Sequence, residues 1–201
     1  MKITPLAIAD AWVCSPTVHG DDRGAFLEWF RSDLLAEATG RRFDVAQANH
    51  STSARGVVRG VHFADTPPGQ SKIVYCAQGE ALDVVVDLRI GSPTFGQSDS
   101  VLLNETDRRV VLIGEGLGHA FCALQDRTSL VYLVSTLYRP EAEHTVSPLD
   151  PDLALSWPLP VDELTLSARD QAAPTLAAAR AAGLLPDYDV CQAWYAGRAE
   201  A

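Results

Sequence analysis

Residues 72–88 read Lys72-Ile73-Val74-Tyr75-Cys76-Ala77-Gln78-Gly79-Glu80-Ala81-Leu82-Asp83-Val84-Val85-Val86-Asp87-Leu88. From Leu82 to Leu88 apolar side chains at every second position alternate with Asp83 and Asp87, which is typical of a strand buried on one face. Gln78-Gly79 separates this run from the preceding one and predicts a hairpin turn. Further extended runs cover 100–103, 109–113, 120–124 and 129–138, with turn residues between them. Many short antiparallel strands at this spacing predict an all-β protein, a sandwich or a barrel.

Two helices are expected outside these strands. The first covers Ser32 to Ala38, where Ser32 can cap the first turn and Gly40 suits a left-handed end residue. The second should follow Pro174, run over 175–182 and end at Gly183. We therefore expect a single domain over residues 1–201, with a helical appendage from about residue 171.

Composition limits the classes of function. The chain has 26 acidic and 16 basic residues and a net charge of −10, which disfavours binding to nucleic acid. It contains no apolar run long enough to span a membrane, and Asp10 interrupts any signal-peptide core. The four cysteines form no C-x-x-C pair and are expected to be free thiols. These features favour a cytoplasmic protein.

A histidine and a lysine occur among the apolar strand residues. Arg59-Gly60-Val61-His62-Phe63 precedes the quoted stretch, and Lys72 begins it. Both polar side chains are costly to desolvate without partners, so they point to chemistry on a ligand. A histidine can take a proton near neutral pH, and a nearby ammonium can stabilise the negative charge that results. The pair suits proton abstraction from carbon next to a carbonyl.

A glycine-rich turn leads into a second histidine. Gly114-Glu115-Gly116-Leu117-Gly118-His119 resembles the second motif of the cupin superfamily. Metal-binding cupins also carry His-x-His and a glutamate in their first motif, whereas His62 is followed here by Phe63 and Ala64. One or two imidazoles do not make a closed metal site, so no metal is expected.

A longer series of motifs occurs in order between about residues 15 and 170. It comprises Asp22-Arg23-Gly24-x-Phe26-x-Glu28, Gln47-Ala48-Asn49-His50-Ser51, Arg59-Gly60-Val61-His62, Gln70-Ser71-Lys72, Asp83-Val84-x-x-Asp87-Leu88-Arg89, Gly91-Ser92-Pro93-Thr94-Phe95-Gly96, Gly118-His119-Ala120-Phe121, Tyr132, Tyr138-x-Pro140-x-x-Glu143 and Asp150-Pro151-x-Leu153. On these residues the chain resembles the dTDP-4-dehydrorhamnose 3,5-epimerases, which are cupin-fold enzymes of nucleotide-sugar metabolism. Two segments, 66–69 and 183–188, resemble the branch that makes deoxysugars for antibiotics.

The resemblance implies a fold, an activity and an assembly. The fold would be a double-stranded β-helix, the cupin jelly roll, with short flanking helices. The enzyme would epimerise a dTDP-4-keto-6-deoxyhexose at C5, C3 or both through an enolate, without a cofactor. It would be a homodimer, because in this family the N-terminal strands exchange and contribute to the neighbour's pocket.

The resemblance also implies the roles of individual residues. His62 would be the base, oriented by Asp170; Lys72 would stabilise the enolate oxygen, and Tyr132 would be the acid on the opposite face. Phe26 and Tyr138 would bracket the thymine, and three arginines would contact the diphosphate or its sugar. The full binding set is Arg23, Phe26, Glu28, Gln47, Asn49, Arg59, His119, Tyr138, Glu143 and Arg169.

Alternatives remain for the residues and for the function. Taken alone, His62 could be a core histidine, Tyr132 a strand aromatic and Lys72 a strand-edge charge, while Asp83 and Asp87 could face solvent. The chain also departs from the family pattern at 64–66, where a glutamine is common, and around Asp150. These departures leave open an epimerase that inverts one centre only, a related 3,4-ketoisomerase, and a cupin that binds a nucleotide sugar without catalysis.

Overall fold

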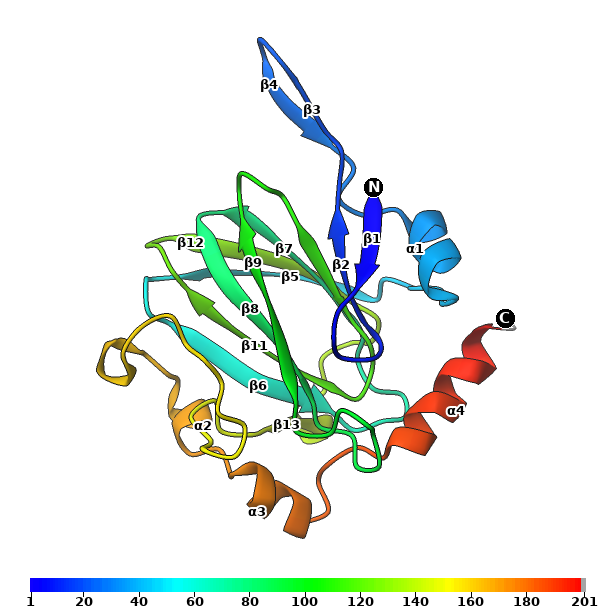
Figure 1. Cartoon of the computed structure of the whole chain (residues 1–201), viewed down its shortest axis with the longest axis vertical. Helices are drawn as coiled ribbons and strands as arrows, with labels where there is room; N and C mark the ends of the chain where they lie inside the picture. The colour runs from blue at the N-terminus through cyan, green and yellow to red at the C-terminus, as the bar shows by residue number, and fades with distance from the viewer. Residues whose placement is uncertain (200–201) are drawn as a thin grey trace.

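The structure, a computed structural model, describes residues 1–199 and consists mainly of two antiparallel sheets that face each other (Figure 1). The six-stranded sheet has the order β1 (Lys2–Pro5), β2 (Ala11–Ser15), β10 (Val110–Ile113), β7 (Lys72–Gln78), β12 (Thr128–Val134) and β5 (Gln47–Ser53). The five-stranded sheet has the order β13 (Glu143–Thr145), β6 (Val58–Ala64), β11 (Leu117–Ala123), β8 (Glu80–Asp87) and β9 (Ser98–Asn104). The predicted all-β jelly roll is confirmed.

The alternation of side chains along the strands produces three apolar layers, one between the sheets and one on the outer face of each sheet. Val74 on β7 and Val85 on β8 belong to the cluster between the sheets. Ile73 points the other way and packs with α1 (Ser32–Thr39) on the outer face of the six-stranded sheet. Val84 and Val86 form the outer face of the five-stranded sheet, which α3 (Leu176–Ala181) covers. The two-residue period therefore sorts each strand between the interior and a helix-covered face.

The helix ends agree only in part with the sequence. Gly40 ends α1 with φ of 69°, as predicted, but Ser32 is the first helical residue and Arg31 is the N-cap, without a side-chain bond. Thr175 caps α3, and Gly183 follows it with φ of 69°. The remaining helical segments are the 3₁₀ turns Pro140–Ala142 and Val161–Glu163, α2 (Ala168–Gln171) and α4 (Tyr188–Ala199).

The hairpin predicted at Gln78-Gly79 is wrong. Strand β7 pairs with β10 and β12, whereas β8 pairs with β11 and β9 in the opposite sheet. Gly79, with φ of 77°, turns the chain from one sheet to the other. Alternation shows which face of a strand is buried, but it carries no information about the neighbouring strand.

A buried ion network ties α4 to the sheets. Asp87, which could have faced solvent on sequence grounds, is fully buried; it accepts two hydrogen bonds from Arg89, at 2.9 and 2.8 Å. Burial disfavours the charge on Arg89, but the hydrogen bonds that Arg89 donates to Asp87 and Asp10 outweigh this effect and hold the pKa of Arg89 above its ordinary value. Asp10 also accepts a hydrogen bond from Gln192 on α4, at 2.9 Å.

A small hairpin, β3 (Val18–Asp21) with β4 (Gly24–Leu27), projects from the body of the molecule (Figure 1). Its residues are exposed except for the partly buried Leu27, and the ring of Phe26 is 67% exposed. A two-stranded hairpin with so little support is marginally stable alone.

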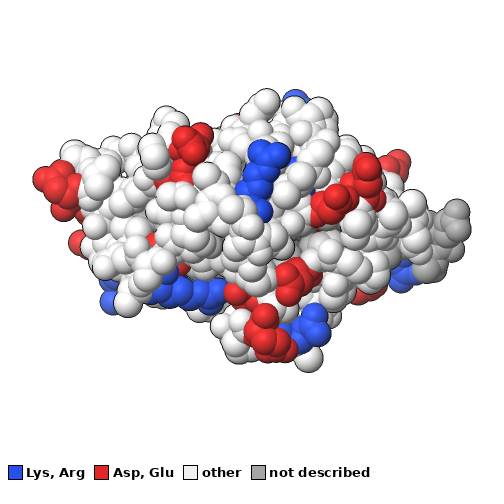
Figure 2. All heavy atoms as spheres, turned by 90° about the horizontal axis from the view of Figure 1, so that it is seen from below, with Lys and Arg blue, Asp and Glu red and all other residues white. Residues whose placement is uncertain are grey.

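Two features of the described residues bear on larger partners. None of their helices is long and apolar enough to cross a membrane. On the face shown in Figure 2, basic side chains lie singly among acidic and uncharged ones, and the described residues there form no continuous basic surface.

Candidate active site

An open cleft lies between the two sheets. Its volume of about 420 Å³ is within the usual size range of ligand sites. It is lined by Gln47, Asn49, His50, His62, Gln70, Lys72, Tyr132, Tyr138, Glu143 and Arg169. Most of the lining residues come from β5, β6, β7, β12 and β13, so both sheets contribute to the cleft, while Gln70 and Tyr138 lie in loops and Arg169 lies on α2.

A bulge in β6 directs His62 into this cleft. His62 pairs with His119, and Arg59 pairs with Phe121. Between these two pairs β6 advances by three residues and β11 by two, so β6 contains one extra residue. A side chain at position 60 is incompatible with this geometry, because φ of Gly60 is 117° and a Cβ would lie 2.4 Å from the carbonyl oxygen of His119. The extra residue allows both Arg59 and His62 to face the interior, although a regular strand would place them on opposite faces.

His62 is held by a buried carboxylate from α2. Its Nε2 lies 2.7 Å from Oδ1 of Asp170, whose side chain is only 4% exposed. Burial works to raise the pKa of Asp170, but hydrogen bonds from His62, Ser167 and the backbone N–H of Gly60 outweigh it, and the pKa is lowered. Asp170 is therefore ionised and accepts from Nε2, which leaves Nδ1 of His62 free to take a proton.

Lys72 and Tyr132 project from the facing sheet. Burial lowers the pKa of the Lys72 ammonium, and the carboxylates of Glu143 and Asp83 oppose the fall. Burial raises the pKa of the Tyr132 phenol, with Arg59 opposing the rise and Glu143 adding to it. Tyr132 thus keeps its proton at neutral pH, as a group that donates one must.

A second histidine–carboxylate pair lies next to the first. His119 Nε2 is 2.7 Å from Oδ2 of Asp83, and both residues are buried. Asp83 therefore does not face solvent, which was one interpretation of the sequence. Its Oδ1 has no hydrogen-bond partner among the described residues. Because His119 is the register neighbour of His62, the two imidazoles share one face of the sheet.

The structure brings together most of the predicted site. Seven of the ten binding residues lie in the cleft or on the strands that form its floor: Gln47, Asn49, Arg59, His119, Tyr138, Glu143 and Arg169. The other three, Arg23, Phe26 and Glu28, do not line this cleft. Arg23 and Phe26 are on the projecting hairpin, where Arg23 forms an exposed ion pair with Asp21 at 2.5 Å. Glu28 follows directly after it and pairs with Arg31.

Three residues at the site were not predicted. His50 and Gln70 line the cleft, and Ser167 bonds Asp170. Both cleft residues lie within matched motifs, so their position next to Asn49 and Ser71 was a usable signal. Ser167 begins the Ser-x-x-Asp pattern of a helix start, which singles it out as a cap but not as part of a site.

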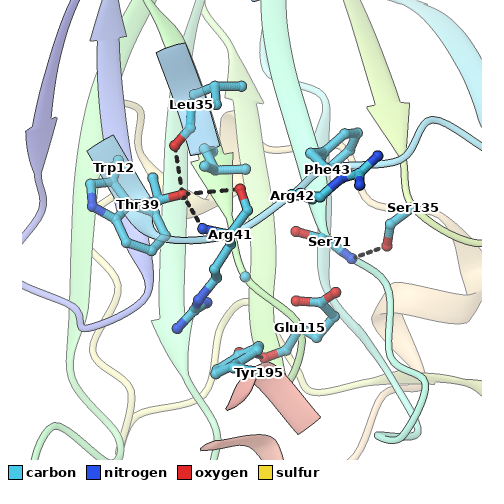
Figure 3. Close-up of a pocket in the computed structure, with 12 residues that line it drawn as sticks. Trp12, Leu35, Thr39, Arg41, Arg42, Phe43, Ser71, Glu115, Ser135 and Tyr195 are labelled. Carbon is cyan, nitrogen blue, oxygen red and sulfur yellow. Dashed lines mark hydrogen bonds between the residues drawn. The ribbon is translucent and has the colours of Figure 1, made fainter. Parts of the chain in front are cut away.

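A second cavity lies on the outer face of the six-stranded sheet, between α1 and α4 (Figure 3). The guanidinium of Arg41 stacks over the ring of Tyr195, 3.4 Å from its centroid, and the Tyr195 hydroxyl donates to the carbonyl of Glu115. Its volume of about 30 Å³ has room for roughly two water molecules, too little for a sugar nucleotide. The open cleft is therefore the candidate site.

No three His, Cys, Asp or Glu side chains of the described chain are grouped so that they could hold a metal ion. The polar groups of the cleft include a histidine with its carboxylate, a lysine and a tyrosine. That set matches proton removal from one face of a carbon and proton return to the other.

Comparisons with known proteins agree with this geometry. The model of the family "dTDP-4-dehydrorhamnose 3,5-epimerase" matches residues 5–178. A dTDP-4-dehydrorhamnose 3,5-epimerase of Mycolicibacterium smegmatis is 54% identical over 96% of this chain and 95% of the relative. A dTDP-4-dehydrorhamnose 3-epimerase of Streptomyces niveus is 52% identical over 96% of this chain and 92% of the relative.

Solved structures show the same likeness. An epimerase of Mycobacterium tuberculosis is 48% identical, with a TM-score of 0.96 over 98% of this chain and all of that one. ChmJ of Streptomyces bikiniensis, a 3'-monoepimerase solved with dTDP-quinovose, is 47% identical, with a TM-score of 0.95 over 98% of this chain and 99% of that one. The fold, the cleft and these matches together establish that the chain belongs to the dTDP-4-dehydrorhamnose 3,5-epimerase family of isomerases.

Proposed function

We propose that this isomerase epimerises a dTDP-4-keto-6-deoxyhexose at C3, C5 or both, through an enolate and with its own side chains as acid and base. The observation that carries the proposal is the His62–Asp170 pair, at 2.7 Å, in one cleft with Lys72 and Tyr132. The substrate class comes from the family and from relatives named for dTDP-sugars.

In the proposed reaction, Nδ1 of His62 removes the proton from the carbon next to the C4 ketone. The electron pair of the broken C–H bond forms the C=C bond of the enolate, and the π electrons of the ketone move onto its oxygen, which becomes negatively charged. Asp170 stabilises the imidazolium that forms, and the Lys72 ammonium stabilises the enolate oxygen. Both groups are in place before the substrate arrives, so little reorganisation is needed.

Inversion then requires a proton from the other face of the sugar. Tyr132 projects from the six-stranded sheet, opposite His62 on the five-stranded sheet. In the proposal its phenol donates the proton to the enolate carbon, and the electron pair on oxygen restores the ketone. Exchange of protons with water returns His62 and Tyr132 to their starting states.

The direct test is NMR of dTDP-4-keto-6-deoxyglucose in D₂O with the purified protein and no added metal. Deuterium at C3, C5 or both, together with changed ring couplings, is the expected result. A protein that only binds the nucleotide sugar would leave both carbons protonated, and that result would contradict the proposal.

The number of inverted centres has two candidate answers. Relatives of nearly equal identity carry names for 3,5-epimerases and for 3-epimerases, and the deoxysugar enzymes of Streptomyces are among them. We propose inversion at C3 as the minimum, because the names of both groups include C3. Deuterium confined to C3 would identify a single-centre enzyme; deuterium confined to C5 would overturn this part.

Tyr132→Phe should uncouple exchange from inversion. His62 still removes the proton and can return a deuteron to the same face, so we expect exchange to persist while inversion falls about 10²–10⁴-fold. Tyr75→Phe is a matched control, because Tyr75 lies on β7 but in the outer apolar cluster. NMR couplings measure inversion, and equal losses of exchange and inversion in Tyr132→Phe would contradict this role.

We also propose that the protein works as a homodimer with shared sites. Arg23 and Phe26 stand on a hairpin away from the chain's own cleft, and exposed Phe26 has no apolar cover in the monomer. A partner's hairpin reaching the cleft would give these residues the nucleotide-binding roles expected of them and would cover that surface.

Mixing two inactive variants tests the shared site. Arg23→Ala and His62→Ala each damage one part of the site, but a heterodimer of the two would contain one site with both native residues. If Arg23 acts in the partner's cleft, denaturing and refolding the mixture should restore activity to about a quarter of wild type. No recovery, or a monomer by light scattering, would contradict the assembly.

We propose the cytoplasm as the working compartment. The four cysteines are buried free thiols, which is typical of proteins kept in a reducing environment. The net charge of −10 argues against a nucleic-acid partner, so the proposed partners are the sugar nucleotide and a second copy of this chain.

A further inference from the structure

Asp170 is fixed by a second side chain besides His62. The Ser167 hydroxyl accepts a hydrogen bond from the backbone N–H of Asp170, at 3.1 Å. It also lies 2.9 Å from Oδ2 of the Asp170 carboxylate. Because an ionised carboxylate can only accept, the hydroxyl proton must point at Oδ2. One serine therefore caps α2 and holds the carboxylate of the same helix turn.

The two oxygens of Asp170 are thus committed to different partners. Oδ2 takes the Ser167 hydroxyl, and Oδ1 takes Nε2 of His62 at 2.7 Å. Rotation of the carboxylate would break both bonds.

We propose that Ser167 is a positioning residue for catalysis, which keeps the Asp170 carboxylate aimed at Nε2 of His62 and thereby leaves Nδ1 free to act as the base. The inference rests on the proposed role of His62 as the base. Without the serine bond the carboxylate would keep the hydrogen bonds from His62 and from the backbone N–H of Gly60, but it would be oriented less firmly towards the imidazole. A histidine that loses a carboxylate partner becomes a weaker base.

Ser167→Ala should therefore lower kcat about tenfold while KM changes less than about twofold, the scale of one hydrogen bond to a charged group. The acid limb of the kcat profile should move to lower pH, because the protonated imidazole in the enzyme–substrate complex loses part of the carboxylate contact that stabilises it. Asp170→Asn should move the limb in the same direction and further. Ser167→Thr keeps the hydroxyl and should restore both quantities.

The other titratable and charged groups that face His62 are unchanged in these variants. They are His50 on β5, Lys72 on β7, the His119–Asp83 pair on β11 and β8, Tyr132 on β12, Glu143 on β13 and Arg169 on α2. A difference between the wild-type and Ser167→Ala profiles therefore reports on the His62–Asp170 pair.

Thr175→Ala is the matched control for loss of a helix cap. Thr175 caps α3 through a bond from the N–H of Ala178, at 3.2 Å, and does not touch the cleft. Both alanine variants should lower Tm by a similar amount, but only Ser167→Ala should change kcat and the pH profile. If Ser167→Ala behaves like Thr175→Ala, or its acid limb moves to higher pH, the inference is wrong.

The experiment separates this inference from the proposed function. If His62→Ala retains exchange in D₂O, His62 is not the base and both proposals fail. If His62→Ala is inactive but Ser167→Ala keeps the wild-type kcat and profile, only the role of Ser167 is overturned.

Discussion

Replacing His62 with alanine is expected to lower the rate of deuterium exchange at the reacting carbons by a factor of about 10²–10⁴. His62 is the imidazole in the cleft with a free Nδ1 and an ionised carboxylate on Nε2. His119 has a similar carboxylate partner, Asp83, but unlike His62 it does not line the cleft. Exchange measured by NMR in D₂O gives this loss directly. A titration with dTDP should show that the Kd of the variant stays within about tenfold of the wild-type value.

His144→Ala is the matched control for this variant. His144 also forms a pair with a carboxylate, Asp65 at 2.6 Å, and its strand β13 lies beside β6. It does not line the cleft, so its removal should leave exchange at the wild-type rate. Equal losses in the two variants would mean that the effect comes from damage to β6 and β13 rather than from loss of a base.

Arg89→Met should lower the free energy of unfolding by about 3–5 kcal/mol, the usual cost of breaking a buried ion pair by removing one partner. Asp87 would remain fully buried without a cation, and its carboxylate would keep only neutral donors, the hydroxyls of Ser92 and Thr94 and the backbone N–H of residue 89. Asp10 would keep Arg41 but lose its second guanidinium. Urea unfolding followed by circular dichroism measures the change.

Arg55→Met provides the comparison for Arg89→Met. Arg55 pairs with Glu163 at 3.0 Å, but its side chain is 51% exposed, so its loss should cost no more than about 1 kcal/mol. If the two variants unfold at the same urea concentration, the buried network does not carry the stability assigned to it.

Much of the chemistry was predictable from the sequence because it resides in single residues within ordered motifs. His62, Lys72 and Tyr132 were chosen from residue type and motif, and they lie together in the cleft. The expected bond between Asp170 and His62 is present across a separation of 108 residues. Motif order could identify His62, Lys72 and Tyr132 because each lies on a single strand, β6, β7 and β12.

Other features depended on contacts that a local pattern does not contain. The alternation over 82–88 is the same whether β8 pairs with β7 or with β11, so the turn at Gly79 was assigned to the wrong kind of connection. Asp83 and Asp87 occupy the polar positions of an alternating pattern that suggested an exposed face. Both are buried, because Asp83 pairs with His119 and Asp87 pairs with Arg89. Ser32 was a plausible cap, but the helix begins at that residue and not after it.

The sequence by itself determined that the chain forms strands and which residues can carry a proton, because side-chain periodicity and acid–base character are local properties. Only the tertiary structure decided which strands are neighbours, that the β6 bulge at Gly60 turns His62 inward, and that Ser167 holds the carboxylate. These depend on close approaches between distant segments, such as that of β6 to β11. Packing and hydrogen bonding across the fold select them, and no stretch of sequence encodes them alone.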